Sequence, residues 1–272
     1  IKACAMIAFD EEDAAIHLLE DGLVEFPDAW MLHYQLGGAL TAAERFEEGI
    51  LALRQAATYE DAEGAQIALS LAKIHLLQGD FEGVLEALSG NQDWDDLELD
   101  RIIMQLSALF ALERWHDILA FTGAMLIEDG EDFLETYGEE SAAHMFAVRA
   151  MALLKGKDQK RAALNLAWDV LRLIPDEKIA LAVVREARGQ RSPFSRIFAL
   201  HCDVTAPNEE PFLGQYLVVA DTLTDAFNFV VEYEAQTTGG EPVLAEHSDA
   251  GPMADEPQGI IELVDEEEED EE

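Results

Sequence analysis

The sequence predicts a mainly α-helical chain: a solenoid of helical hairpins, then a small α+β module, then an acidic disordered tail. Two stretches can be aligned at a shift of 35 residues, and each has the pattern of a helix–turn–helix. After Ser192-Pro193 the composition changes to short β-prone runs, and from Asp265 to Glu272 every residue is acidic. One helical hairpin cannot bury its own apolar face, so repeated hairpins stack into an elongated array with a long open surface.

The two aligned copies share a leucine followed by a small residue, an aromatic residue after the turn, and small and large residues alternating in the second helix. Apolar residues recur at helical spacing in both copies, which favours helices over strands. The shared positions are Leu36, Gly37, Leu40, Phe46, Gly49, Leu53 and Ala56 in the first copy, and Leu71, Ala72, His75, Phe81, Val84 and Leu88 in the second. Weaker copies follow at Leu106, Phe110, Trp115, Ile118 and Met125, and at Ala150, Leu154, Ala163, Val170 and Pro175.

These copies resemble the tetratricopeptide repeat (TPR) over roughly residues 1–190. The resemblance implies that a further first helix lies at Lys2 to Phe9, before the second helix that ends near Pro27. The sequence departs from the family where an aromatic residue is expected in the first helix, because His33 and Ala68 occupy that place. The segment from Glu128 to Glu140 lengthens the spacing between the last two copies and is interpreted as an insertion. A generic array of helical hairpins is the alternative.

The region after Pro193 predicts a ββαββ module. Candidate strands are Ile197–Val204, Gln215–Ala220, Pro242–Ala245 and Gly259–Val264, and a helix capped by Asp221 or Thr222 runs from Leu223 to Glu234. One helix packed on one sheet is the simplest way to bury these apolar faces. We therefore expect a helical-repeat domain over 1–191, an α+β module over 194–264 and a disordered tail over 265–272, because a run of acids repels itself.

The net charge of −40 is distributed unevenly along the chain. Residues 1–148 hold 6 basic and 31 acidic side chains, residues 149–196 hold 11 and 5, and residues 197–272 hold no Lys or Arg and 21 acids. Such a surface repels nucleic acid and anionic membranes and attracts basic proteins. The sequence therefore predicts a basic or mixed apolar and basic protein partner, with no nucleic acid and no membrane. Acidity that serves only solubility is the alternative.

The TPR resemblance implies a groove, lined by the first helix of each repeat, that binds peptides. Carried onto this chain, the groove residues are Met31, Tyr34, Gly38 and Thr41 from one repeat and Gln66, Leu69, Lys73 and Leu77 from the next. Some family members hold a carboxylate with Lys and Asn at these places, and only Lys73 fits that pattern. An apolar groove with acidic rims suits a peptide that is part hydrophobic and part basic. Alternatively, Met31, Tyr34 and Leu69 are core residues.

The chain also carries a basic island between its two acidic parts. Its members are Lys155, Lys157, Lys160, Arg161, Arg172, Lys178, Arg185, Arg188 and Arg191. This island could dock an acidic partner, or it could receive the chain's own acidic module or tail, because a tethered opposite charge has a high effective concentration. Ordinary solvated helix faces are the third interpretation.

No catalytic signature is found. The sequence lacks a glycine-rich phosphate loop and a His-Glu-x-x-His pattern, and His201 and Cys202 would point to opposite faces of a strand. Two distant cysteines favour reduced thiols in the cytoplasm. We therefore expect a non-enzymatic, cytoplasmic adaptor or scaffold that needs no metal and no cofactor. The alternatives are an immunity-type or nucleic-acid-mimicking inhibitor of a basic enzyme or toxin, a chaperone for an unfolded or secreted client, and an enzyme whose site lies in the C-terminal module.

Overall fold

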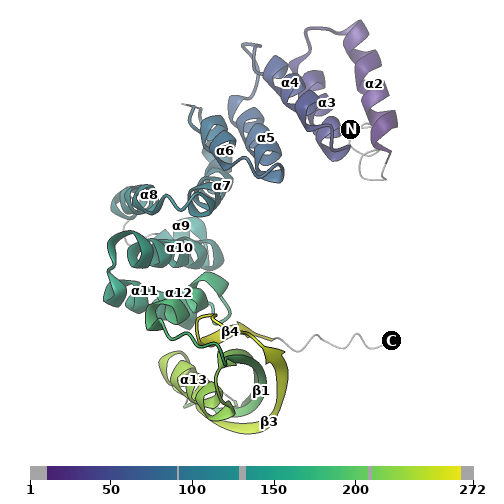
Figure 1. Cartoon of the computed structure of the whole chain (residues 1–272). Coiled ribbons are helices and arrows are strands. Elements are labelled where there is room, and N and C mark those ends of the chain that lie inside the picture. The colour runs from purple at the N-terminus through teal and green to yellow at the C-terminus, as the bar shows by residue number, and fades with distance from the viewer. Residues whose placement is uncertain (1–10, 91, 129–132, 208–209, 265–272) are drawn as a thin grey trace. The chain divides into compact units, whose positions relative to one another are not determined.

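The computed structural model describes residues 11–264 of this 272-residue chain, apart from 91, 129–132 and 208–209. The chain divides into two compact units, with the boundary between Arg114 and Trp115. Elements are labelled as in Figure 1, and each unit is described by itself. The predicted fold class is confirmed, because the first unit is helical and the second holds further helices and a four-stranded sheet. The predicted helix at Lys2 to Phe9 and the predicted tail at 265–272 lie outside the described residues.

The first unit is an array of helical hairpins. Its elements are α2 (Glu12–Glu25), α3 (Trp30–Ala42), α4 (Phe46–Ala56), α5 (Gly64–Leu77), α6 (Phe81–Leu88), the 3-10 turn η1 (Asp95–Leu97) and α7 (Glu98–Ala111). Each helix contacts the next along the chain, and α3 also contacts α5, as α5 contacts α7. The first helices of successive hairpins therefore lie side by side, and we call α3, α5 and α7 the A helices.

The turns inside the hairpins repeat with the period seen in the sequence. Glu44, Gly79 and Glu113 follow α3, α5 and α7, and they have φ values of 57°, 71° and 53°. This left-handed conformation ends a helix and lets the chain reverse, and glycine adopts it most easily. The residue after each turn donates its backbone N–H to the last part of the A helix: Arg45 to Leu40 O at 2.8 Å, Asp80 to His75 O at 2.8 Å, and Arg114 to Leu109 O at 2.9 Å.

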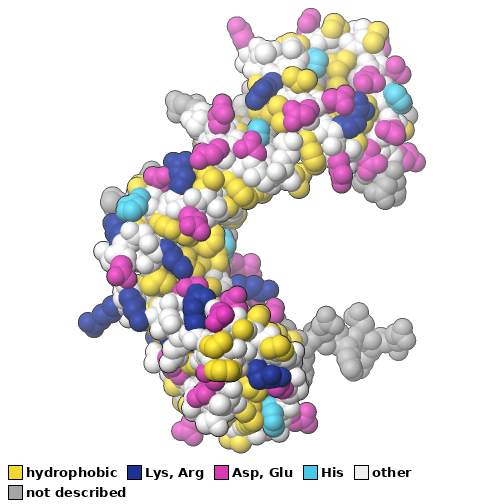
Figure 2. Space-filling model, in the orientation of Figure 1, with side chains coloured by type: hydrophobic (Ala, Val, Ile, Leu, Met, Phe, Trp, Pro, Cys, Tyr) yellow, Lys and Arg dark blue, Asp and Glu magenta, His cyan; other side chains and the backbone are white. Residues whose placement is uncertain are grey.

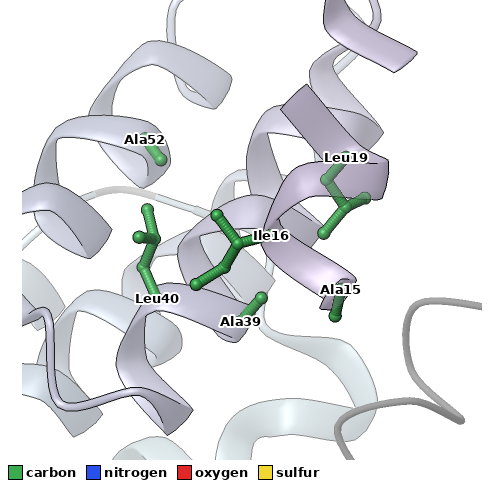
Figure 3. Packing of buried hydrophobic residues seen from close by; sticks show 6 residues of the cluster. All are labelled: Ala15, Ile16, Leu19, Ala39, Leu40 and Ala52. Carbon is green, nitrogen blue, oxygen red and sulfur yellow. The ribbon is translucent and has the colours of Figure 1, made fainter. Parts of the chain in front are cut away.

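The core of the first unit consists of apolar clusters that each span neighbouring hairpins. In Figure 3, Ile16 and Leu19 of α2 lie near Ala39 and Leu40 of α3, and Ala52 of α4 joins the same cluster. The next clusters contain Trp30, Ile50, Leu53, Ala56, Ile67 and Ile74, and then Ala72, Val84, Leu88 and Ala108. Because each cluster links only adjacent hairpins, the packing is that of a repeat array.

The apolar positions shared by the two aligned copies differ in how deeply they are buried. Leu40 is buried, whereas Leu36, Leu71 and Phe81 are half-buried and pack against the edges of the clusters. Ile74, one turn after Leu71 in α5, is almost completely buried. A helix packed between two neighbours buries a wide stripe, and the stripe of α5 is centred closer to Ile74 than to Leu71.

The second unit begins with further helices. These are α8 (Trp115–Glu128), α9 (Phe133–Tyr137), α10 (Glu139–Lys157), α11 (Lys160–Leu173) and α12 (Lys178–Arg188). The central helix α10 buries a face rich in small residues, and it contacts α8, α11 and α12. Small side chains allow such close approach of several helices. The predicted insertion at 128–140 includes α9, and residues 129–132 lie outside the described part.

The C-terminal module has the predicted ββαββ order. Its elements are β1 (Arg196–Thr205), β2 (Phe212–Ala220), α13 (Leu223–Gln236), β3 (Glu241–Pro252) and β4 (Gly259–Leu263). The sheet is antiparallel with strand order β3-β1-β2-β4, and α13 packs against it (Figure 1). Thr222 caps α13 by accepting the Asp225 N–H at 3.1 Å. Alternate residues of β1, from Phe198 to Val204, are buried, which is the pattern of a sheet covered on one face.

The sheet also contacts the helix that precedes it in the second unit, because β4 packs against α12. The module and the helices α8 to α12 thus form one compact unit. The domain limits of 1–191, 194–264 and 265–272 stay a prediction.

Candidate functional site

The predicted groove residues of α3 lie on one face of that helix. Met31, Tyr34, Gly38 and Thr41 follow the helical spacing of three and four residues. Met31 is 42% exposed, and a side chain added at Gly38 would meet nothing within 4 Å. Tyr34 is half-buried against the cluster that contains Trp30 and Ile74. Thr41 is half-buried and donates its hydroxyl to Gly37 O at 2.7 Å, so this hydroxyl is used within α3.

The predicted groove residues of α5 share a face in the same way. Lys73 is exposed, Leu77 is 57% exposed, and Gln66 is half-buried. Leu69 is half-buried and packs against the cluster that contains Val84 and Ala108. Leu69 therefore contacts the next hairpin, as Tyr34 does from α3. The alternative interpretation of these residues as core holds in part for Tyr34 and Leu69, and Met31 lies outside the core.

A hydrogen bond joins the two faces. The Ser70 hydroxyl of α5 donates to the Tyr34 hydroxyl of α3 at 3.3 Å. Lys73 lies one turn after Ser70, and Gln66 lies one turn before it, on the same side of α5. The structure thus brings α3 and α5 together at Tyr34, with exposed positions around the contact. We call the set Met31, Tyr34, Gly38, Gln66, Leu69, Ser70, Lys73 and Leu77 the A-helix surface.

A cavity that the sequence analysis missed adjoins Gln66. It has a volume of about 550 Å³ and lies between the start of α5 and the segment before α7. Its lining includes Glu63, Asp93, Trp94 and Asp96, so it combines an aromatic ring with carboxylates. The only sequence signal was a tryptophan inside an acidic run. In Figure 2, acidic side chains outnumber basic ones on the visible face around α2 to α5.

The basic island divides into two groups. The first group contacts the C-terminal module within the second unit. Arg188 pairs with Glu232 of α13 at 2.7 Å and lies over the Phe229 ring at 4.7 Å, and Lys178 pairs with Glu262 of β4 at 3.2 Å. Arg172 Nε donates to Gln236 O at 2.9 Å, and Arg191 donates to Asp255 O at 2.8 Å. Arg185 lies close to Gly259, because a Cβ at Gly259 would be 2.9 Å from Arg185 Cγ.

One carboxylate also organises this group. Glu186 accepts from Lys155 at 3.0 Å and from Arg191 at 3.0 Å. Although partial burial opposes it, these two cations hold the pKa of Glu186 below its usual value. Burial lowers the pKa of Arg185. The positive charges of α12 are thus largely matched by acids of the same unit.

The second group of the island is Lys157, Lys160 and Arg161, where α10 ends and α11 begins. All three are exposed. Within the described part of the chain they form no ion pair. Among the described residues, no hydrogen bond or ion pair of the structure joins these three side chains to the module.

His33 and His75 make contacts within the fold, and Cys202 lies in its core. His33 Nε2 lies 3.1 Å from Pro27 O, and its ring stacks on Tyr59 at 5.8 Å. His75 Nδ1 lies 2.8 Å from the Asp80 carboxylate. Cys202 is buried, and burial raises the pKa of its thiol to about 11, which makes it unreactive. Among the described residues no three His, Cys, Asp or Glu side chains cluster as metal ligands, and no helix is long and apolar enough to cross a membrane.

This chain is similar to a solved structure over about two thirds of its length. The crystal structure of YrrB, "a TPR protein with an unusual peptide-binding site", is similar over 67% of this chain and 88% of that chain, with a TM-score of 0.51 and 16% sequence identity. The helices form a TPR-like fold. No family model matches the chain, and no curated protein matches it.

The structure shows the surroundings of the two residues that depart from the family's pattern. His33, at a place where the family expects an aromatic residue, stacks on Tyr59 and so supplies a flat ring there. Ala68, at the equivalent place of α5, is buried against its neighbours. The left-handed turns at Glu44, Gly79 and Glu113 recur at intervals of 35 and 34 residues along this TPR-like array.

Proposed function

We propose that this protein is a non-enzymatic, acidic adaptor or scaffold that binds a partly basic protein or peptide on its A-helix surface. The observation that carries the proposal is the contact of α3 and α5 through Tyr34 and Ser70, with Met31, Gly38 and Lys73 left accessible around it. A continuous surface across two hairpins can hold an extended or helical peptide over several residues.

The chemistry of this surface favours a ligand with both apolar and basic side chains. Met31 and Leu77 offer apolar contacts at 42% and 57% exposure. The adjoining cavity with Glu63, Trp94 and Asp96 suits a cationic side chain, because carboxylates attract it and the ring face stabilises it. Lys73 restricts where basic side chains of the ligand can lie, since a basic residue placed directly over it would be repelled. The described peptide-binding site of YrrB supports a peptide ligand for this chain by analogy of fold alone.

We place the protein in the cytoplasm, where its thiols stay reduced. The exposed group of the basic island, Lys157, Lys160 and Arg161, is proposed as a separate contact for an acidic partner or for the chain's acidic tail. Neither the adaptor role nor this contact requires a metal or a cofactor.

The test is selection of binding peptides from a random library, followed by affinity measurement with point variants. Selected peptides should be enriched in Lys or Arg and in large apolar residues. Gly38→Trp should weaken binding at least tenfold, because it adds bulk at an open position of the A-helix surface. Leu51→Trp on α4 is the matched control, since Leu51 is 66% exposed and belongs to a second helix of a hairpin.

The outcomes separate the rival functions. Equal effects of the two tryptophan variants would disprove the A-helix surface as the binding site. Weak binding of many unrelated peptides, all sensitive to Gly38→Trp, would indicate a chaperone for unfolded clients. Tight binding of a folded basic protein that is insensitive to Gly38→Trp would indicate an inhibitor that acts by charge.

A further inference from the structure

A second cavity lies in the C-terminal unit, where α11, α13, β2 and β4 meet. Its volume is about 370 Å³. Its lining includes three aromatic residues, one carboxylate and one hydroxyl: Phe212, Tyr216, Tyr233, Glu234 and Thr238. The cavity belongs to a different compact unit from the A-helix surface and shares no residue with it.

Glu234 is the unusual feature of this cavity. Its side chain is buried, with 1% of the residue exposed. One carboxylate oxygen accepts the Tyr216 hydroxyl at 2.6 Å, and the other accepts the Thr238 hydroxyl at 2.6 Å. Thr238 in turn accepts the Gly240 N–H at 3.0 Å, so its hydroxyl proton is directed at Glu234. Burial and the bond to Glu234 raise the pKa of Tyr216 far above its ordinary value, so this phenol remains a donor.

Both oxygens of Glu234 therefore act as acceptors, which is the pattern of an ionised carboxylate. Among the described residues no cation pairs with it. A buried carboxylate without a counter-charge is costly, and two neutral hydroxyls offset only part of that cost. Each oxygen retains a lone pair, and the residue lines an open cavity. The negative charge of Glu234 is thus not balanced by a cation among the described residues.

The cationic side chain in the cavity wall, Arg172, is engaged elsewhere. Its NH1 donates to Asp169 at 2.6 Å, and its Nε donates to the backbone oxygen of Gln236 at 2.9 Å. Arg172 is 45% exposed on its side chain, in contrast to buried Glu234. Arg172 and Asp169 compensate each other, so they leave the charge of Glu234 unmatched.

Aromatic rings complete the wall around Glu234. Tyr216 and Tyr233 meet edge to face with centroids 6.2 Å apart, and Phe212 lies at the mouth with 37% exposure. Ring faces attract an organic cation, and a cavity that combines rings with a carboxylate is suited to an alkylated ammonium. The backbone is fitted closely to this arrangement, because a Cβ at Gly214 would collide with the Tyr216 hydroxyl.

We propose that this cavity binds an ammonium group carried on an apolar stem. The ammonium donates to Glu234, and the stem lies against Phe212 and the neighbouring apolar wall. Lysine side chains of a partner protein and small aliphatic amines share this chemistry. Residues 197–272 contain no Lys or Arg, so the module's own field favours the approach of a cation.

The experiment titrates the full chain with two probes while amide shifts are followed by NMR. The probes are Nα-acetyl-lysine methylamide and n-butylammonium, each compared with an uncharged analogue, Nα-acetyl-norleucine methylamide or n-butanol. The charged probes should shift the amides of Tyr216, Glu234 and Thr238, and the uncharged ones should not. Tighter binding of the lysine derivative would identify a protein side chain as the ligand, and tighter binding of the amine would identify a small molecule.

Variants test the role assigned to the carboxylate. Glu234→Gln keeps the shape and should weaken binding about 10- to 100-fold, the range expected for a charge-assisted hydrogen bond. Glu241→Gln removes the same charge from an exposed position at the start of β3 and should leave binding nearly unchanged. Phe212→Ala, at the partly exposed mouth, should weaken binding without altering the buried hydrogen bonds, and it serves if Glu234→Gln does not fold.

Three results would overturn the proposal. The first is an absence of shifts at the cavity with either charged probe in the unmodified chain. The second is an equal loss of binding in Glu234→Gln and Glu241→Gln, which would indicate general attraction by an acidic surface. The third is loss of binding on Arg172→Met, because a cation site should gain or keep affinity when that charge is removed.

Discussion

Two adjacent glycines in α3 provide a sharp test of the packing between hairpins. Gly37 and Gly38 both lie inside α3, so alanine at either position gains the same helix propensity, about 0.5–1 kcal/mol. Their surroundings differ. A Cβ at Gly38 would meet nothing within 4 Å, whereas a Cβ at Gly37 would lie 2.6 Å from Leu53 Cγ and 3.2 Å from Gly49 O. Leu53 is buried, so it has little room to move.

The expected magnitudes come from these distances. Overpacking of a closely packed core costs about 1–3 kcal/mol. Gly38→Ala should therefore raise the free energy of unfolding by about 0.5–1 kcal/mol. Gly37→Ala should lower it by up to about 2 kcal/mol, because the propensity gain offsets part of the collision. Since the propensity gain is common to both variants, their difference measures the overpacking alone, about 1–3 kcal/mol.

The assay is urea unfolding followed by far-ultraviolet circular dichroism, with the two variants and the unmodified chain measured together. A double variant supplies the control. Leu53→Ala removes the two closest atoms and leaves the contact with Gly49 O at 3.2 Å, so Gly37→Ala in that background should lose most of its overpacking cost. If the two glycine variants differ by less than about 0.5 kcal/mol, α3 and α4 do not approach closely at Gly37, and the packing assigned to this pair of helices is wrong.

Two further predictions concern the same unit. Ile74→Ala should lower the free energy of unfolding in urea by about 2–5 kcal/mol, because Ile74 is buried. Leu71→Ala should lower it by only about 1 kcal/mol, because Leu71 is half-buried. Equal losses would show that the face of α5 toward the core is misassigned. Glu44→Gly should stabilise the chain by about 0.5–1 kcal/mol, since φ is 57° there, and Gly79→Ala should destabilise it by a similar amount, since φ is 71°. Thermal shifts of the same sign in these two variants would contradict the left-handed turns.

The sequence by itself determined the order of the main described elements. The shift of 35 residues between the first two copies reappears as the spacing of the turns at Glu44 and Gly79. The ββαββ order could be predicted because strand alternation and helical spacing are local properties of a few consecutive residues. The charge distribution was also known from the sequence, since the positions of Lys, Arg, Asp and Glu along the chain need no structure.

The depth of each apolar residue could not be predicted from the same pattern. Leu71 and Ile74 both fit a helical apolar stripe, and only the positions of the neighbouring hairpins decide which one is buried. The same holds for the predicted groove, where Tyr34 and Leu69 are half-buried between A helices and Gly38 faces open space. Neighbouring helices can rotate about their axes by small angles without changing the sequence pattern, so exposure is a property of the packing.

The cavity at Glu234 was decided by tertiary structure alone. Its carboxylate comes from α13, the hydroxyl of Tyr216 comes from β2, and Arg172 comes from α11, so they are distant in sequence. The chain has 57 Asp and Glu residues, so nothing in the sequence distinguished Glu234 from the other acids. The pairing of the α12 cations with the acidic module was one of several options that the charge pattern left open. Long-range contacts of this kind depend on how whole elements pack, which local sequence spacing does not encode.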